Sequence, residues 1–295
     1  MEVADQLLDR ALAIGARSIA VVGTGKNVGK TVVMRAIYRA ALARGMEVGL
    51  TSIGRDGEAN DFVDAVAKPR LRLAAGTLVA GALGALPRSP ALQWCECTDL
   101  QSASGPLAIV RVRTESEVEL VGAPTASGLR ACVASLFAHG AEIVAIDGAI
   151  DRIAALREED AVVVCCGAAS SPSVEAIAAE VGALVALLRL PRYDGDGAAL
   201  RIEGALTPMH AAALIAAGER RAVVVRDATR VTLRGRAFLG ALDRLRICVE
   251  RPLRPVAVTI NSVGRRGSVE PAALLQAVHA AVALPTFDLF AARAA

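Results

Sequence analysis

Short apolar runs alternate with longer amphipathic runs along most of this chain. Ser18 to Val22 (SIAVV) is apolar and β-branched, as is typical of a buried parallel strand. Thr31 to Ala43 contains neither proline nor glycine, and its apolar residues recur at helical spacing. Because this alternation continues to the end of the chain, we predict an α/β fold, a doubly wound, mostly parallel sheet with helices on both faces.

The remaining elements are predicted from the same periodicities. Predicted strands are 46–53, 91–97, 107–112, 142–146, 161–165, 222–225, 255–260 and 284–289, and predicted helices are 129–139, 174–188, 208–217, 238–245 and 271–282. The most apolar segment, Leu71 to Leu86, is predicted to be a helix and is too short to span a bilayer. No linker or repeat divides the chain. We therefore expect one domain over residues 1–295, with an irregular insertion at about 66–130.

Composition narrows the class of protein. The net charge of +3 is spread along the chain without a Lys/Arg-rich block, which argues against nucleic acid as a partner. The N-terminus reads as an acidic amphipathic helix and not as a signal peptide, so a cytoplasmic protein with no membrane segment and reduced thiols is expected. Cys95 and Cys97 would share a strand face. The six cysteines could form a metal site, or they could serve as small hydrophobic residues in the core.

The main chemical signal is GTGKNVGKT, Gly23 to Thr31, between the first predicted strand and helix. Small residues at a helix N-terminus let backbone N–H groups surround phosphate oxygens. Lys30 would contact the β- and γ-phosphates of a nucleotide, and Thr31 would ligate Mg²⁺. The predicted nucleotide-binding residues are Gly23, Thr24, Gly25, Lys26, Asn27, Val28, Gly29, Lys30 and Thr31. The spacer between Gly23 and Gly29 is one residue longer than the usual four.

Lysine usage supports the same interpretation. The chain contains thirty arginines but only three lysines, Lys26, Lys30 and Lys68. A position that keeps lysine in such a sequence is one where a compact ammonium fits and a planar guanidinium does not. Two of the three lysines lie in this loop, so we predict a functional phosphate site.

Carboxylates at other predicted strand ends could hold the metal. Ligands bind at the carboxyl ends of the strands in such sheets. Asp147 follows an apolar strand, and Asp56 follows the strand 46–53, with Glu58 and Asp61 close behind. We predict Asp147 and Asp56, with Thr31, as the Mg²⁺ site, and Asp147 with Lys30 as the catalytic pair. The alternatives are a turn or N-cap role for Asp147 and a solvated acidic loop for the others.

The strand Val258-Thr259-Ile260 ends at Asn261, whose amide can both donate to and accept from an adenine edge. Here a family resemblance appears. GTGKNVGKT and the C-terminal run AVTINSVGRRGSVEPAALLQAVHAAVALPTFDLF resemble the dethiobiotin synthetases, which carry the same five-residue spacer. The resemblance implies ATP and Mg²⁺ as ligands, Asp147 at a metal-ligand position and Asn261 at the adenine. It covers both ends of the chain and matches the middle poorly.

The departures from that family concern the substrate. Dethiobiotin synthetases have a Lys-Pro pair after the second strand, where this chain has Thr51 to Arg55. Gly25 occupies the position at which related partition-type ATPases have their signature lysine. Lys26 lies one residue after that position. The related cobyrinic acid amidases need a glutaminase domain for which this chain has no room. The substrate chemistry is therefore not carried over.

A second resemblance is to the P-loop reactivase subunit associated with lysine 5,6-aminomutase. It rests on GTGKNVGKT, SIGRDGE (52–58), IDGAIDR (146–152) and VTIN (258–261). It implies a slow Mg²⁺-dependent ATPase that acts on an adenosylcobalamin-dependent partner enzyme. The alternatives are an ATP-dependent ligase for a small carboxylate or carbamate, and a nucleotide-dependent scaffold without turnover. A homodimer is compatible with this superclass, which often places its sites near dimer interfaces.

Overall fold

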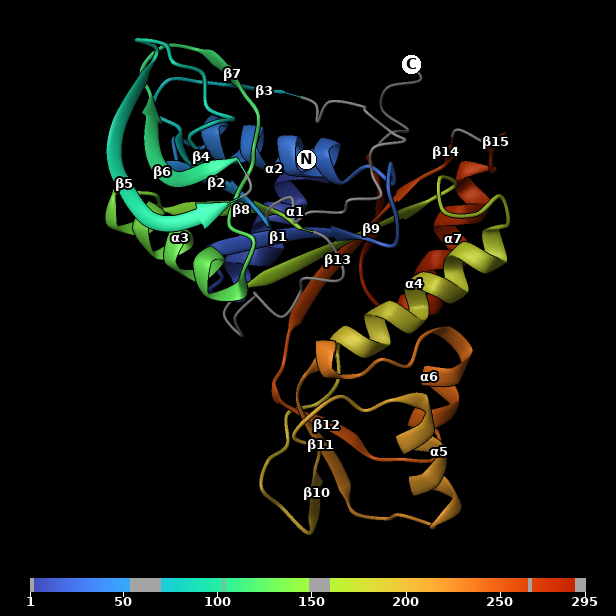
Figure 1. Cartoon of the computed structure of the whole chain (residues 1–295). Helices are drawn as coiled ribbons and strands as arrows, with labels where there is room; N and C mark the ends of the chain where they lie inside the picture. Colours follow the sequence, from blue (N-terminus) through green and yellow to red (C-terminus); the bar gives the residue numbers. More distant parts are fainter. Residues whose placement is uncertain (1–2, 54–69, 103, 149–159, 265–266, 290–295) are drawn as a thin grey trace. The chain divides into compact units, whose positions relative to one another are not determined.

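The computed structural model describes residues 3–53, 70–102, 104–148, 160–264 and 267–289 (Figure 1). The chain forms two compact units. The first is Met1–Val21 with Thr31–Ala155, and the second is Val22–Lys30 with Leu156–Ala295. Helices and mostly parallel strands make up both units, which confirms the α/β class. The single-domain organisation stays a prediction.

Parallel strands form the centre of the first unit. Its strands have the order β1-β8-β2-β4-β6-β5, which is part of a nine-stranded sheet. The strands β1, β8, β2 and β4 run parallel, while β6 and β5 form an antiparallel hairpin at the edge. A second small sheet pairs β3 with β7. The strand bounds are β1 Ser18–Gly23, β2 Val48–Ser52, β3 Leu71–Leu73, β4 Leu78–Ala82, β5 Leu92–Ser102, β6 Gly105–Val112, β7 Ser116–Val118 and β8 Ile143–Asp147.

Helices cover both faces of this sheet. In Figure 1, α2 (Lys30–Ala43) and α3 (Ala126–Ala138) lie on opposite faces. This follows from the strand order, because right-handed crossovers in opposite directions along a sheet place their helices on opposite sides. The first helix, α1 (Val3–Ala13), is held to the end of α2 by Arg44, which pairs with Asp5 at 2.9 Å and with Asp9 at 2.5 Å.

The predicted helix at Leu71 to Leu86 is wrong. The segment forms β3 and β4, and Gly76 between them has a φ of 93°, a backbone conformation that ends regular structure. All five residues of β4 are buried, since this strand lies between β2 and β6. A continuous apolar run therefore reflects burial on both sheet faces and not a helix.

The cysteines divide into two groups. Cys132, Cys165, Cys166 and Cys248 are buried, and burial raises the pKa of the Cys132 thiol to about 11, as expected for small hydrophobic residues. Cys95 and Cys97 are not buried, contrary to that expectation. Nor do they share a regular strand face: Trp94 pairs with Val110 and Glu96 with Ile109, so Cys95 is the extra residue of a β-bulge.

The second unit contains two separate parallel sheets. The strands β9 (Ala161–Gly167), β13 (Arg254–Asn261) and β16 (Thr286–Asp288) pair in the order β16-β13-β9. The helices α4 (Val174–Leu188) and α7 (Pro271–Val282) pack against each other (Figure 1). A short antiparallel hairpin, β14 (Val263–Gly264) with β15 (Gly267–Ser268), follows β13.

The segment between α4 and β13 differs from the expected continuous sheet. Its strands β10 (Ala199–Arg201), β11 (Ala222–Asp227) and β12 (Ile247–Arg251) form a three-stranded parallel sheet of their own. The connections contain α5 (Pro208–Ala216), a 3₁₀ turn at Ala228–Arg230 and α6 (Gly235–Leu242). All three strands end in exposed or half-buried charged residues.

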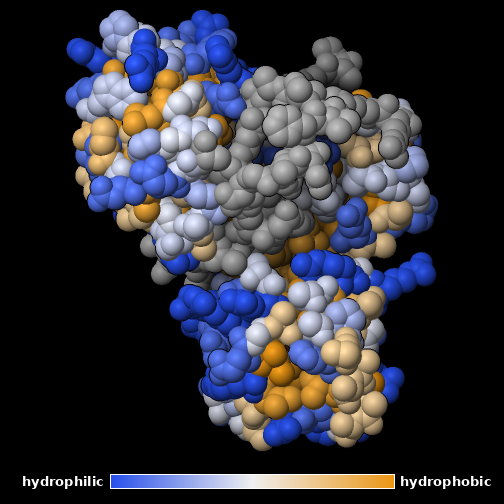
Figure 2. Space-filling view, in the orientation of Figure 1, coloured by the Kyte–Doolittle hydropathy of each residue, from blue (hydrophilic) through white to orange (hydrophobic). Residues whose placement is uncertain are grey.

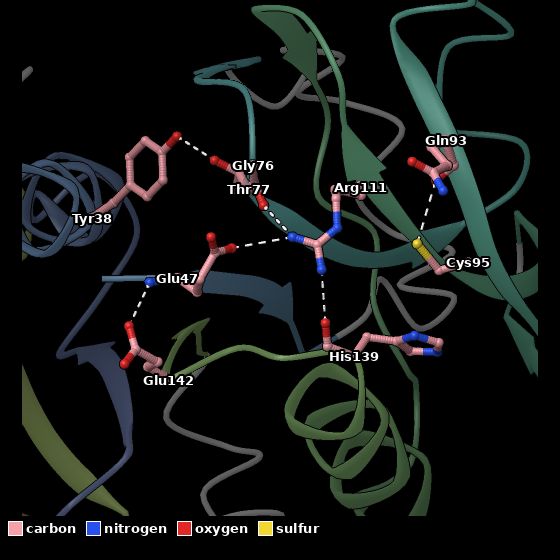
Figure 3. Close-up of polar contacts among 9 residues, drawn as sticks. All are labelled: Tyr38, Glu47, Gly76, Thr77, Gln93, Cys95, Arg111, His139 and Glu142. Carbon is pink, nitrogen blue, oxygen red and sulfur yellow. Dashed lines mark hydrogen bonds and ion pairs between the residues drawn. The ribbon is translucent and has the colours of Figure 1, made fainter. Parts of the chain in front are cut away.

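A polar cluster ties the amino ends of strands in the first unit (Figure 3). Arg111 donates to the Glu47 carboxylate at 3.1 Å, to the Gly76 carbonyl at 3.3 Å and to the His139 carbonyl at 2.8 Å. Glu142 accepts from the Glu47 backbone N–H at 2.9 Å. Glu47, Gly76 and Glu142 precede β2, β4 and β8, at the edge opposite the carboxyl ends where ligands bind. We interpret the cluster as a structural clamp.

No helix among the described residues combines the length and the apolar character needed to cross a membrane.

Candidate functional site

The loop Thr24 to Gly29 connects a fully buried strand to a helix. All six residues of β1 are buried, and α2 begins at Lys30. Two loop residues have left-handed backbone conformations, Asn27 with a φ of 61° and Gly29 with a φ of 102°. Asparagine and glycine adopt this conformation at lower cost than other residues, so the sequence suits the turn that brings the chain back to the helix start.

Packing inside the loop explains two of its residue types. Val28 is buried, and a Cβ added at Gly23 would lie 2.6 Å from its Cγ2 atom. The same Cβ would lie 3.0 Å from the Cγ atom of Lys30. Only glycine at position 23 therefore leaves room for the valine and for the aliphatic stem of the lysine.

The ammonium group of Lys30 lies within the loop. Its Nζ atom donates to the carbonyl oxygen of Gly25 at 2.6 Å. The hydroxyl of Thr24 is buried and has no hydrogen-bond partner among the described residues, which is unusual because an unpaired buried polar group costs about 1–3 kcal/mol. A cationic group and an unsatisfied hydroxyl in one loop are what an anionic ligand would use.

Two neighbouring strands of the second unit support the loop. The Thr24 backbone N–H donates to the carbonyl of Cys165 on β9 at 2.9 Å. A Cβ at Gly25 would lie 3.7 Å from Ser170, in the turn after β9. From β13, the Asn261 amide nitrogen lies 3.5 Å from the carbonyl oxygen of Asn27. The loop is thus held over the carboxyl ends of β9 and β13, the ligand-binding edge of a parallel sheet.

Asn261 is nearly buried, with 8% of its surface exposed. Its side-chain oxygen accepts from the Val263 backbone N–H at 3.1 Å, which is the hydrogen bond of an Asx turn. One lone pair of the amide oxygen is therefore used by the turn, and the second remains. The structure therefore gives Asn261 a role in a turn, and its contact with adenine stays a prediction.

Asp147 ends β8 in the first unit. It stands in register with Val21 on β1, two residues before Gly23, and with Ser52 on β2. The Ile53 backbone N–H donates to its carbonyl at 2.9 Å. Asp147 therefore lies at the carboxyl ends of β1, β8 and β2 in the first unit, and its role at a metal stays a prediction.

The other candidate ligands differ in how they are placed. Thr31 is half-buried in the first turn of α2, while Lys26 is exposed. Asp56, Glu58 and Asp61 lie outside the described residues. Within the described part of the chain, no group of three or more His, Cys, Asp or Glu residues could hold a metal ion. A threonine hydroxyl with one carboxylate nevertheless suits Mg²⁺ bound to phosphates, because this ion keeps several waters.

Two supports of the loop were not found from the sequence. The carbonyl of Cys165 is a backbone group, which no residue type encodes. Ser170 belongs to a serine-rich turn whose distance from the loop depends on the order of strands in the sheet. A turn after a strand that neighbours a phosphate loop is the signal that could have indicated Ser170.

Comparison with protein-family models, curated proteins and solved structures found no match.

Proposed function

We propose that the chain is an ATP-binding P-loop protein of the dethiobiotin synthetase-like superclass, which hydrolyses ATP slowly with Mg²⁺. The observation that carries this proposal is the loop of Gly23 to Lys30, where the Lys30 ammonium turns inward onto the Gly25 carbonyl at 2.6 Å. A phosphate group would accept hydrogen bonds from this ammonium and from the backbone N–H groups at the start of α2.

Each residue has a distinct part in the proposed reaction. Lys30 binds and orients the terminal phosphates and balances their charge. Thr31 and Asp147 would hold Mg²⁺, which neutralises charge on the phosphates when it is bound. Asn261 would contact the adenine. The measurement that tests the proposal is calorimetry with ATP, ADP and GTP, followed by assays of phosphate release.

The proposal extends to a protein partner and a cytoplasmic location. An adenosylcobalamin-dependent aminomutase is proposed from the second family resemblance, and the cytoplasm is proposed because all six cysteines are free thiols. Hydrolysis stimulated by the aminomutase supports this role. Stimulation by a small carboxylate or carbamate would indicate a ligase, and binding without either response would indicate a scaffold.

The role of Asp147 can be tested by substitution. Asp147→Asn keeps the side-chain shape and removes the charge, so hydrolysis is expected to fall by on the order of a hundredfold while ATP affinity changes severalfold at most. Phosphate release and ATP binding are measured at saturating Mg²⁺. Asp99→Asn, an exposed carboxylate on β5, is the matched control and should leave both unchanged. Equal turnover in the Asp147 and Asp99 variants would make Asp147 a turn residue.

The role of Asn261 requires two variants, because its amide also forms a turn. Asn261→Asp keeps the acceptor for the Val263 N–H and loses the N–H donors, whereas Asn261→Ala loses both. If Asn261 contacts adenine, each variant should lower the affinity for ATP severalfold to about tenfold. The reason is that one or two hydrogen bonds of roughly 0.5–1.5 kcal/mol each are lost. ATP should bind better than GTP to the unmodified protein.

Tripolyphosphate is the control ligand for the Asn261 variants, since it contacts the loop without a base. Its affinity should be the same in all three proteins. If ATP and GTP bind equally and Asn261→Asp changes neither, the adenine role is excluded and only the turn role remains.

A further inference from the structure

The helix α5 has an unusual surface for its composition. Its nine residues, PMHAAALIA, are apolar except for His210, yet only Ala211 is buried. Met209 is 74% exposed, and Ala212, Ala213 and Ala216 are exposed as well. A helix that is apolar nearly all round is normally covered by other elements.

Local signals account for the formation of α5 without burial. Thr207 caps the first turn by accepting from the His210 N–H at 3.2 Å, and Pro208 occupies the first helical position. Gly218, with a φ of 66°, follows its end. The alanines of α5 also favour a helix by their propensity, so the helix can form with most of its surface exposed to water.

The neighbouring helix carries another exposed apolar residue. α5 contacts α6, on which Leu239 is 38% exposed. In Figure 2 the surface where Figure 1 labels α5 is weakly hydrophobic, with strongly hydrophilic residues nearby. We call the exposed residues of α5 together with Leu239 the α5 surface. Contiguous exposed apolar surface with a polar rim is typical of an interaction site.

The segment of the chain that contains α5 is strongly positive. Residues 189–254 contain thirteen arginines and seven carboxylates, a net charge of +6, whereas the rest of the chain sums to −3. The even spread of charge expected from the sequence is therefore wrong. Three pairs neutralise part of this charge, Arg201 with Glu250, Arg221 with Glu219 and, at 3.8 Å, Arg246 with Asp194.

Exposed arginines flank both ends of α5. The carbonyl of Arg230 accepts from the backbone N–H of Leu206 at 2.7 Å, which places Arg230 beside the start of the helix. Arg220 follows its end, and Arg236 lies in the first turn of α6. Among the residues described, none of these three guanidinium groups has an ion-pair partner. The α5 surface is thus an apolar strip bordered by uncompensated positive charge.

We propose that the α5 surface docks an acidic protein segment, an amphipathic helix with an apolar face bordered by carboxylates. The apolar strip supplies the desolvated centre of the contact, and the arginines select carboxylates at the rim. A second copy of the chain is disfavoured because the arginines that border one surface would face the arginines of the other. Nucleic acid is disfavoured because α5 itself carries no Lys or Arg at the centre of the surface.

The test is a selection of short helical peptides from a random library on the intact chain, without nucleotide. Enriched peptides should combine an apolar face with acidic residues, and their binding should weaken as salt is raised. Met209→Glu and Leu239→Glu should each weaken it roughly tenfold or more. Position 209 is in the first turn of α5, where an acidic residue favours the helix, so that variant should fold normally.

Leu12→Glu is the matched control, an exposed leucine on α1 in the other unit. It should leave peptide binding unchanged. No enrichment, enriched peptides without acidic residues, or binding that Met209→Glu does not affect would each overturn the proposal. So would a dimer or RNA binding that Met209→Glu abolishes. Since nucleotide is absent, the outcome is independent of the proposed ATP site.

Discussion

Replacing Lys30 by methionine is expected to lower ATP affinity by on the order of a hundredfold or more, because hydrogen bonds from the ammonium to phosphate oxygens are lost and each is worth roughly 1.5–3 kcal/mol. Methionine keeps an unbranched stem like the one that packs beside Gly23. The loop should therefore keep its shape, and the loss should report charge alone. Calorimetry with ATP and Mg²⁺ measures the effect.

Two further variants test whether the loss of ATP affinity is specific to the ammonium group of Lys30. Arg39→Ala removes one positive charge from the exposed face of the same helix and should leave ATP affinity unchanged. Lys30→Arg keeps the charge, but a planar guanidinium does not fit where the ammonium lies 2.6 Å from the Gly25 carbonyl, so ATP should bind weakly here too. Unchanged ATP affinity in Lys30→Met would exclude the phosphate-loop interpretation.

Gly167→Ala is expected to destabilise the second unit by about 3 kcal/mol, because the added Cβ would lie 2.1 Å from the carbonyl oxygen of Asn261. This oxygen also accepts from the Ala168 N–H at 2.9 Å. The ends of β9 and β13 would have to separate, and the support for the phosphate loop would move with them. Thermal unfolding should begin roughly 6–12 °C lower, and ATP affinity should fall as well.

The control for this prediction is Gly204→Ala, the same substitution in the same unit. A Cβ at Gly204 meets nothing within 4 Å. Its unfolding temperature should stay within a degree or two of the unmodified protein, because surface changes rarely exceed about 0.5 kcal/mol. Equal unfolding temperatures for the two variants would show that the strand ends adapt without cost.

The sequence predicts the elements on both sides of the loop Thr24 to Gly29 because their signals are local. Burial on both sides makes β1 continuously apolar, and the absence of glycine and proline from Thr31 to Ala43 identifies α2. The same signal fails at Leu71 to Leu86, where an apolar run rich in glycine and alanine suits a buried strand as well as a helix. Only the partners of β4, which are distant in sequence, decide between them.

The residues of the candidate site show the same division between local signals and contacts that are distant in sequence. Local sequence indicates Lys30 through the Gly-Lys-Thr motif and Asp147 through the apolar strand that it ends. The bond from Thr24 to the Cys165 carbonyl and the contact of Asn261 with the loop depend on which strands are neighbours. The fold of residues 189–254 could not be predicted for the same reason. Periodicity predicts strands, but it does not predict that β10, β11 and β12 pair with one another in a separate sheet.

The bulges of β5 have a consequence for the solubility of the protein. This strand of eleven residues pairs with β6 on one side and forms the edge of its sheet. A long regular edge is a template on which other chains can add strands and form aggregates. The pairing of β5 shifts register between Trp94 and Glu96 and again between Cys97 and Gln101. An incoming strand therefore meets no continuous row of evenly spaced N–H and C=O groups, which protects newly made chains from joining edge to edge.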